Sequence, residues 1–168
     1  NVTIGHVLTA IDNDGNVSWA SVSAVTPGMF WTSGSTNLEN IISSNVTRVD
    51  ATGQYAVAWG DSNLASGYAS TSMGTSNVAS GVTSTSMGRT TVAGGASSLA
   101  HGRTTKAYGS QSHAEGLNTI ASGEASHAEG FGTEANSEWS HAEGQNTIAN
   151  AEAAHAEGVN TIAFNTYS

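Results

Sequence analysis

Small apolar residues alternate with polar ones from about residue 55 to the end of the chain, and the alternation returns every fourteen residues. In one such unit Ala114 lies between His113 and Glu115, and Ala121 repeats the pattern seven residues later. Side chains on a strand point alternately to its two faces, so each alanine faces opposite to its neighbours. Each unit is therefore predicted to form two short strands that turn an alanine inward and larger residues outward.

Glycine marks the period of this pattern. Eight glycines are spaced fourteen residues apart, at Gly60, Gly74, Gly88, Gly102, Gly116, Gly130, Gly144 and Gly158. A fixed period indicates stacked units, each of which buries its face against the next. A helix is the competing interpretation of alanine-rich sequence. It is disfavoured because glycine recurs every seven residues through most of the array, and each would cost about 1 kcal/mol in a helix.

Two columns of alanine are predicted to fill the interior of the stack. Such small residues on both strands of a unit require two sheets that lie close together, as in a thin roll. Ser72 and Ser86 replace alanine in the first column. The predicted core residues are Ala58, Ala65, Ala79, Ala93, Ala100, Ala107, Ala114, Ala121, Ala128, Ala135, Ala142, Ala149, Ala156 and Ala163.

Residues 1–54 lack the repeat and are predicted to form a small β-rich adaptor, whereas residues 55–168 form the array. Alternating residues on both sides of the segment 12–15 predict two strands joined by a turn. The same Asp-Asn-Asp-Gly segment resembles part of a calcium loop, but the remaining ligands of an EF-hand are missing, so the turn is preferred. Residues 38–50 are expected to form a short helix followed by a strand.

Outward-facing residues beside the first alanine column form a continuous seam. A roll filled with alanine buries little apolar area, so this seam is expected to pack against sister chains around a symmetry axis. The seam changes from apolar to ionisable part way along the array. The predicted interface residues are Val57, Trp59, Met73, Met87, Leu99 and His101, followed by the pairs His113/Glu115, His127/Glu129, His141/Glu143 and His155/Glu157.

The His-x-Glu pairs are the main candidate for chemistry. Three interpretations are open: a hydrogen-bonded His–Glu ladder between chains, which is favoured, an axial metal or anion site at His113, Glu115, His127 and Glu129, or a solvated face. In the ladder, the glutamates are expected to raise the histidine pKa values. Apart from such an ion, no cofactor is predicted.

Composition and charge narrow the function classes. The chain of 168 residues has a formal net charge of −9, which argues against nucleic acid as a partner. It has no cysteine for disulfides or thiolate metal sites, and no apolar run of the length that membrane insertion needs. His-Ala-Glu-Gly is not the H-E-x-x-H zinc motif, and repeated identical units argue against a unique active site. An enzyme is therefore not expected.

A column of threonines and three glycosylation sequons are weaker patterns in the sequence. Thr91, Thr105, Thr119, Thr133, Thr147 and Thr161 recur three residues after the repeat glycine. Regular hydroxyls invite an ice- or mineral-binding hypothesis, but polar residues on the outer turns of a solvated fibre are the simpler interpretation. Asn1, Asn16 and Asn45 each begin an N-x-Ser/Thr sequon and are candidate glycan sites.

The segments "STSMGTSNVASG" (70–81) and "SHAEGLNTIASG" (112–123) resemble the head repeats of YadA-type trimeric autotransporter adhesins. The resemblance covers about residues 55–165 and implies a left-handed parallel β-roll of about eight turns in a homotrimer. It also implies that residues flanking the first alanine face the trimer axis. The chain departs from the pattern where His and Glu occupy these positions, and where Ser137, Ala151 and Asn165 replace the spacing glycine.

The His-Ala-Glu-Gly variant is also similar to repeats of phage and other viral appendage proteins, and residues 5–22 resemble segments that precede trimeric phage fibre modules. These resemblances imply a structural fibre segment that attaches to a host cell or surface. Its partners would be two identical chains and a host-surface protein or glycan. The expected location is extracellular, on a virion or on a bacterial surface, and the chain is expected to be a segment of a longer protein. A bacterial trimeric adhesin head is the alternative to a viral fibre.

Overall fold

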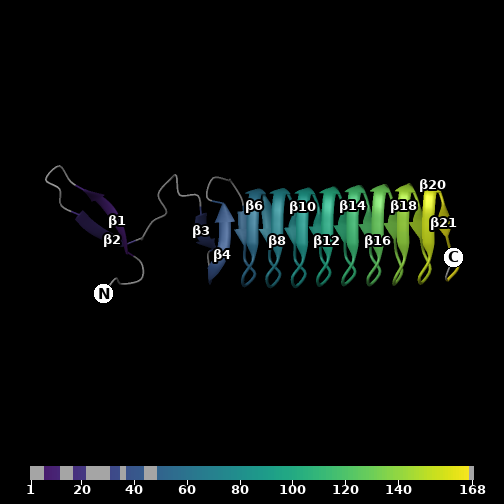
Figure 1. The fold of residues 1–168 in the computed structure, drawn as a ribbon, viewed down its shortest axis with the longest axis horizontal. Helices are drawn as coiled ribbons and strands as arrows, with labels where there is room; N and C mark the ends of the chain where they lie inside the picture. Colours follow the sequence, from purple (N-terminus) through teal and green to yellow (C-terminus); the bar gives the residue numbers. More distant parts are fainter. Residues whose placement is uncertain (1–5, 12–16, 22–30, 35–36, 44–48, 167–168) are drawn as a thin grey trace.

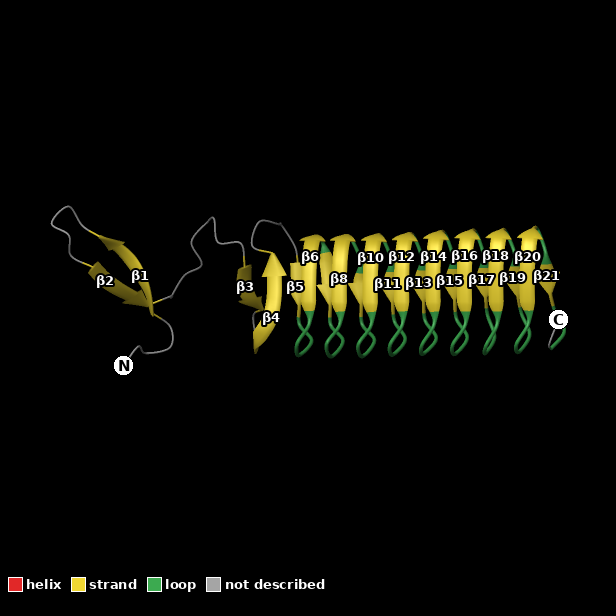
Figure 2. Ribbon diagram, in the orientation of Figure 1, coloured by secondary structure: helices red, strands yellow, loops and turns green. Residues whose placement is uncertain are grey.

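The computed structural model describes residues 6–11, 17–21, 31–34, 37–43 and 49–166, with side chains from residue 50 onward. Every regular element in these residues is a β-strand. From residue 49 the chain winds into a parallel β-solenoid of about eight turns, seen as a row of stacked coils in Figures 1 and 2. The described residues contain no helix of the length and apolar character needed to cross a membrane. The all-β fold and the repeat of fourteen residues are confirmed.

Each turn contributes one strand to each of two sheets. The larger sheet contains β6 (Val57–Asp61), β8 (Thr71–Thr75), β10 (Thr85–Arg89), β12 (Leu99–Arg103), β14 (His113–Leu117), β16 (His127–Phe131), β18 (His141–Gln145) and β20 (His155–Val159). The smaller strands are β5 (Val49–Ala51), β7 (Asn63–Ala65), β9 (Val78–Ala79), β11 (Val92–Ala93), β13 (Lys106–Ala107), β15 (Ile120–Ala121), β17 (Glu134–Ala135), β19 (Ile148–Ala149) and β21 (Ile162–Ala163). Neighbouring strands are parallel and paired at a spacing of one repeat, as in His113 with His127.

The N-terminal strands agree with the sequence only in part. β1 (His6–Ile11) and β2 (Val17–Ser21) pair antiparallel, which confirms the two predicted strands. The short helix expected from residue 38 is wrong, because β4 (Asn37–Ser43) is a strand paired with β3 (Trp31–Gly34). β4 also pairs in parallel with β6, at Ile41 with Val57, so the larger sheet extends beyond the repeats. Pairing across this sheet, together with two adjacent β-branched isoleucines, overrides the local helical preference.

Several sequence predictions fall outside the described residues. The turn at residues 12–15, its calcium-loop alternative and the sequons at Asn1, Asn16 and Asn45 are among them. The division at residue 54 and the left-handed sense of the roll stay predictions.

The interior of the solenoid is a double column of alanine. All fourteen predicted core alanines are buried, and thirteen of them have no exposed surface. Because the side chains are this small, the two sheets lie close enough for polar side chains to reach the facing backbone.

The threonine column lies inside, which corrects the prediction that it decorates the outer turns. Thr91, Thr105, Thr119, Thr133 and Thr147 have no exposed surface, and only Thr161, in the last turn, is exposed. The physical reason is the strand period of two, since each threonine precedes an inward alanine by two residues. The buried hydroxyls are not available to order water on a surface, so this column does not carry an ice-binding face.

In the first turns asparagine takes the place of threonine, a feature the sequence interpretation missed. The Asn77 side-chain amide donates hydrogen bonds to the carbonyls of Met73 and Gly88, at 2.8 Å each. Its side-chain oxygen accepts from the amide of Thr91 at 2.9 Å and from the Thr91 hydroxyl at 2.8 Å. Asn63 makes the equivalent bonds one turn earlier. These asparagines tie consecutive turns together inside the roll.

Candidate functional site

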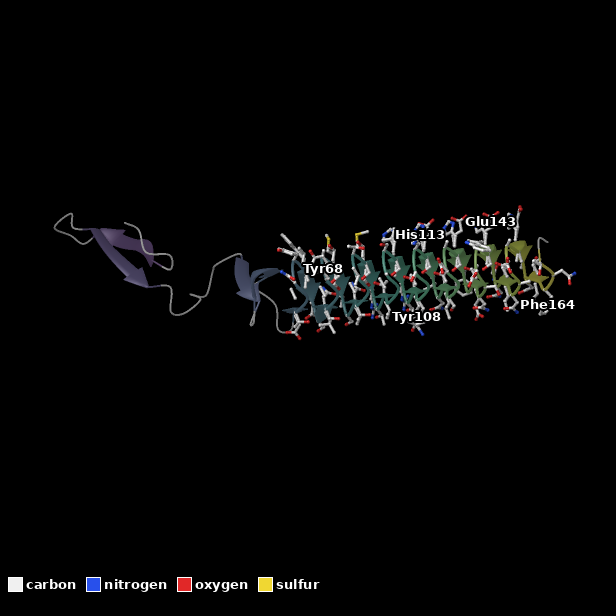
Figure 3. The ribbon with its side chains drawn as sticks, turned by 90° about the horizontal axis from the view of Figure 1, so that it is seen from below. Tyr68, Tyr108, His113, Glu143 and Phe164 are labelled. Carbon is white, nitrogen blue, oxygen red and sulfur yellow. The ribbon has the colours of Figure 1, made fainter. Side chains whose placement is uncertain are left out.

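The His and Glu columns form a ladder on the outer face of the larger sheet. We call the residues His113, Glu115, His127, Glu129, His141, Glu143, His155 and Glu157 the His–Glu ladder. In-register pairing of β14, β16, β18 and β20 stacks each histidine on the next. Ring centroids are 4.7–4.8 Å apart and the rings are within 13° of parallel. His113 and Glu143 project from one side of the rod, and Tyr108 projects from the opposite side (Figure 3).

Within one chain the ladder pairs are close but not hydrogen-bonded. The Nε2 atom of His113 lies 3.7 Å from a Glu115 carboxylate oxygen, and His127 and His141 lie 3.9 Å from the glutamates of their own strands. His155 instead approaches Glu143 of the preceding turn, at 3.6 Å. Hydrogen bonds of this type are about 2.7–3.2 Å long, so these contacts are ion pairs at most. A hydrogen-bonded ladder between chains therefore stays a prediction.

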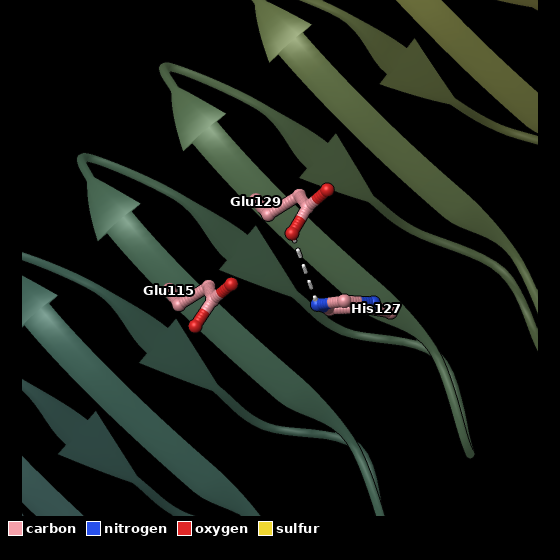
Figure 4. A group of neighbouring side chains, drawn as sticks. All are labelled: Glu115, His127 and Glu129. Carbon is pink, nitrogen blue, oxygen red and sulfur yellow. Dashed lines mark ion pairs between the residues drawn. The ribbon is translucent and has the colours of Figure 1, made fainter.

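Two histidines of the ladder carry a buried ring nitrogen without a partner. The Nε2 atoms of His127 and His141 are shielded from solvent and accept or donate no hydrogen bond. Each nitrogen belongs to a cluster with the glutamate of its own strand and the glutamate of the strand before, with all ligand atoms within 4.8 Å of one another. Figure 4 shows the first of these clusters, with His127 beside Glu129 and Glu115 on the neighbouring strand. The third such cluster, at the end of the array, is more exposed.

Burial governs the protonation of the histidines. Desolvation lowers the pKa of His127, the neighbouring His113 lowers it further, and Glu115 and Glu143 only partly oppose this. Desolvation and the adjacent His127 and His155 likewise lower the pKa of His141. Within one chain the glutamates do raise the pKa of both histidines, but desolvation and the neighbouring histidines outweigh them. The raised pKa expected in a ladder between chains stays a prediction. At neutral pH both rings are uncharged, which is the form that binds metal ions.

The ladder carboxylates stack on one another as the histidines do. Hydrogen bonding with the Glu143 carboxyl raises the pKa of Glu129 above its ordinary value, and desolvation and Glu115 add to the effect. No lysine or arginine follows Lys106 in the sequence, so the ladder strands β14, β16, β18 and β20 contain no fixed cation. Four stacked carboxylates thus depend on protons, bound ions or another chain for neutralisation.

A shallow groove of about 740 Å³ runs beside the carboxylate column. Its walls are His101 and the ladder glutamates Glu115, Glu129, Glu143 and Glu157. The repeat glycines beside these residues also line the groove: Gly102, Gly116, Gly130, Gly144 and Gly158. The groove is the natural place for an ion or for side chains of another chain.

The predicted apolar part of the seam continues the ladder toward the N-terminal end of the array. Trp59 and Met73 are 48% and 41% exposed, and Val57, Met87 and Leu99 are half-buried. His101 is exposed and pairs in register with Glu115, so it stands in the glutamate column. The structure thus brings all predicted seam residues onto one face of one sheet.

A second outward stripe was not singled out from the sequence. Leu64, Val78, Val92, Ile120 and Ile148 occupy the outward position of the smaller sheet and are half-buried. The sequence contains the pattern that would have predicted this stripe, since each of these apolar residues follows a repeat glycine by four positions. Lys106 and Glu134 interrupt the stripe, so it is less continuous than the seam.

Comparison with known proteins finds the repeats. A family model described as the YadA head domain repeat matches the chain in two copies, over residues 51–77 and 114–130. The first match contains Val57, Trp59 and Met73 of the seam, and the second contains Glu115, His127 and Glu129. No curated protein and no solved structure matches the chain. The matched residues coincide with turns of the solenoid, and the chain therefore carries YadA-like head repeats.

Proposed function

We propose that the chain is a structural segment of a homotrimeric fibre, whose three rolls pack through the outer face of the larger sheet. The observation that carries the proposal is the seam. Large side chains line up on this face, over a core built only from alanine and small polar residues. Each buried alanine methyl contributes only about 0.8 kcal/mol, so the core of one roll provides little hydrophobic stabilisation.

Packing between chains supplies the missing burial. Trp59 and Met73 lie about half exposed beside one another on β6 and β8, where a monomer would leave them in water. Closed cyclic symmetry would cover these side chains equally in every chain. The same symmetry would bring three copies of the His–Glu ladder together, where histidines of one chain can meet glutamates of the next.

The proposed role of the fibre is attachment to a host cell or surface, without chemistry of its own. YadA-like head repeats support an adhesin-type function, and the rod shape suits the presentation of a binding surface at a distance. The partner would be a host-surface protein or glycan, and the location extracellular. A phage or viral appendage is the preferred context, because of the His-Ala-Glu-Gly variant and the N-terminal segment 5–22.

The head of a bacterial trimeric adhesin is the alternative context. Flanking coding sequence separates the two. A coiled coil followed by a membrane anchor identifies the bacterial protein, whereas a chaperone or a receptor-binding tip identifies the viral fibre.

Sedimentation equilibrium of the whole chain tests the assembly. The expected mass is three times the 16.9 kDa of one chain. Met87→Glu places a charge in the proposed interface and is expected to dissociate or unfold the trimer. Tyr108→Glu, on the opposite side of the rod, is the matched control and should leave the mass unchanged. A folded wild-type monomer, or equal behaviour of the two variants, would contradict the proposed interface.

A further inference from the structure

We propose that Glu115, His127 and Glu129 bind a divalent transition metal ion, and that Glu129, His141 and Glu143 repeat the site one turn later. Each set offers one imidazole nitrogen and two carboxylate oxygens, all within 4.8 Å of one another. All ligands come from one chain, so the site does not depend on the proposed trimer.

The spacing of the ligand atoms fits a metal ion better than direct pairing. Ligands about 2.1 Å from a tetrahedral zinc ion lie roughly 3.4 Å from one another. The His127 Nε2 and Glu129 oxygen atoms are 3.9 Å apart, too far for a hydrogen bond. Small rotations of the two half-buried carboxylates about their side-chain bonds would close this difference while the backbone stays fixed in the sheet.

The imidazole provides a second, independent observation. The Nε2 atoms of both His127 and His141 are buried against their neighbours, and neither has a hydrogen-bond partner. A buried polar atom without a hydrogen-bond partner destabilises the fold. A metal ion between the carboxylates would satisfy the His127 nitrogen, which faces a Glu129 oxygen at 3.9 Å (Figure 4).

Charge and ligand type select the ion. Two carboxylates neutralise one divalent cation, and the ladder has no lysine or arginine after Lys106 to compete for them. Imidazole favours zinc, cobalt, nickel and copper over magnesium and calcium, which prefer all-oxygen sites. The three protein ligands leave at least one position for water or for a residue of another chain. Glu129 belongs to both sets, so two ions in the two sites would share three carboxylates, Glu115, Glu129 and Glu143.

Cobalt titration of the chelator-stripped whole chain tests the site. In excess Mg²⁺, Co²⁺ is expected to bind, to develop visible absorption bands, and to be displaced by Zn²⁺. The double variant His127→Gln/His141→Gln should bind Co²⁺ at least about tenfold more weakly. His6→Gln removes a histidine of β1, outside the ladder, and should bind as the wild type does. Absence of Co²⁺ binding above the Mg²⁺ background, or unchanged binding by the double variant, would overturn the proposal.

A measurement on the wild-type chain covers the case in which the double variant does not fold. Crystals soaked in Co²⁺ should show an anomalous difference peak between the His127 imidazole and the carboxylates of Glu115 and Glu129. A peak at this place supports the site. A map without it, at an occupancy that detects cobalt elsewhere, rejects the site.

Discussion

The residue type at many positions of this solenoid is restricted by contact with the next turn along the chain. Gly116 shows the constraint most clearly, because its φ of +108° lies in the region that favours glycine. A Cβ atom built there would lie 2.2 Å from the Gly130 carbonyl oxygen, which is fixed in the next turn. The glycine period seen in the sequence is thus required both by the backbone conformation and by the close approach of successive turns.

Gly116→Ala is expected to lower the free energy of unfolding by roughly 2–4 kcal/mol, since both the positive φ and the contact with backbone penalise a side chain. Gly132→Asn is the matched control. Asn118 and Asn146 occupy the equivalent positions at positive φ, and the nearest atom to a Gly132 Cβ belongs to the Asn146 side chain, which can rotate. In the control, the free energy of unfolding should rise by about 0.4–1 kcal/mol or remain unchanged. Urea denaturation measures both, and equal losses would refute the positional argument.

Asn77→Ala is expected to cost roughly 3 kcal/mol or more. The substitution leaves the carbonyls of Met73 and Gly88 and the amide of Thr91 without their partner inside the roll. Asn77→Thr should lose less than half as much, because threonine fills the same position at Thr91 and in later turns. Thermal melting followed by circular dichroism ranks the two variants, and a harmless alanine would show that these bonds do not stabilise the stack.

The strands of each turn were predictable from the local alternation of residues. Which side chains point into the roll was predictable only in part. The inward alanines follow directly from the period of two. The same rule places Thr91 inward, two residues before Ala93, yet its hydroxyl suggests an outer position. In the roll, the Thr91 hydroxyl has two partners, Ser86 five residues earlier and Asn77 in the preceding turn. The partner in the preceding turn is fourteen residues away and is not visible in a local pattern.

The His–Glu ladder makes stability depend on pH. For His127 and His141 the pKa in the folded chain lies below the ordinary value of 6.5, so the unfolded chain binds protons more readily. The stability that they contribute is complete above pH 6.5 and is lost as the pH falls. The contribution of Glu129 to stability depends on pH in the opposite direction, because its pKa is raised in the folded chain. This contribution is complete below about pH 4.5 and is lost as the pH rises through the raised pKa.

Thermal melting in the presence of chelator, from about pH 7 down to about pH 5, separates these effects. The wild type should lose stability toward the acidic end relative to His127→Gln/His141→Gln, in which the titrating rings are absent. Glu129→Gln should remove the loss of stability that the Glu129 carboxyl causes as the pH rises. Identical profiles for the wild type and the double histidine variant would mean that burial does not control these rings.

For the whole molecule, the repeat specified a stacked β-fold, and the alanine columns specified how thin it is. The sequence of one chain could not specify whether the seam is covered, since that depends on contacts outside the chain. The sequence also could not reveal that each histidine of a cluster lies near glutamates of two successive strands. His127 shares its cluster with Glu115 of the preceding strand as well as with Glu129, because strands stacked one repeat apart place these side chains side by side. A strand considered alone contains only the second pair.

A density map viewed down the long axis of the fibre tests the central claim most directly. Three rolls related by a threefold axis are expected, with Trp59, Met73 and the His–Glu ladder turned toward that axis. A single roll, or a trimer that turns the smaller sheet and its Val78 stripe inward, would contradict this expectation.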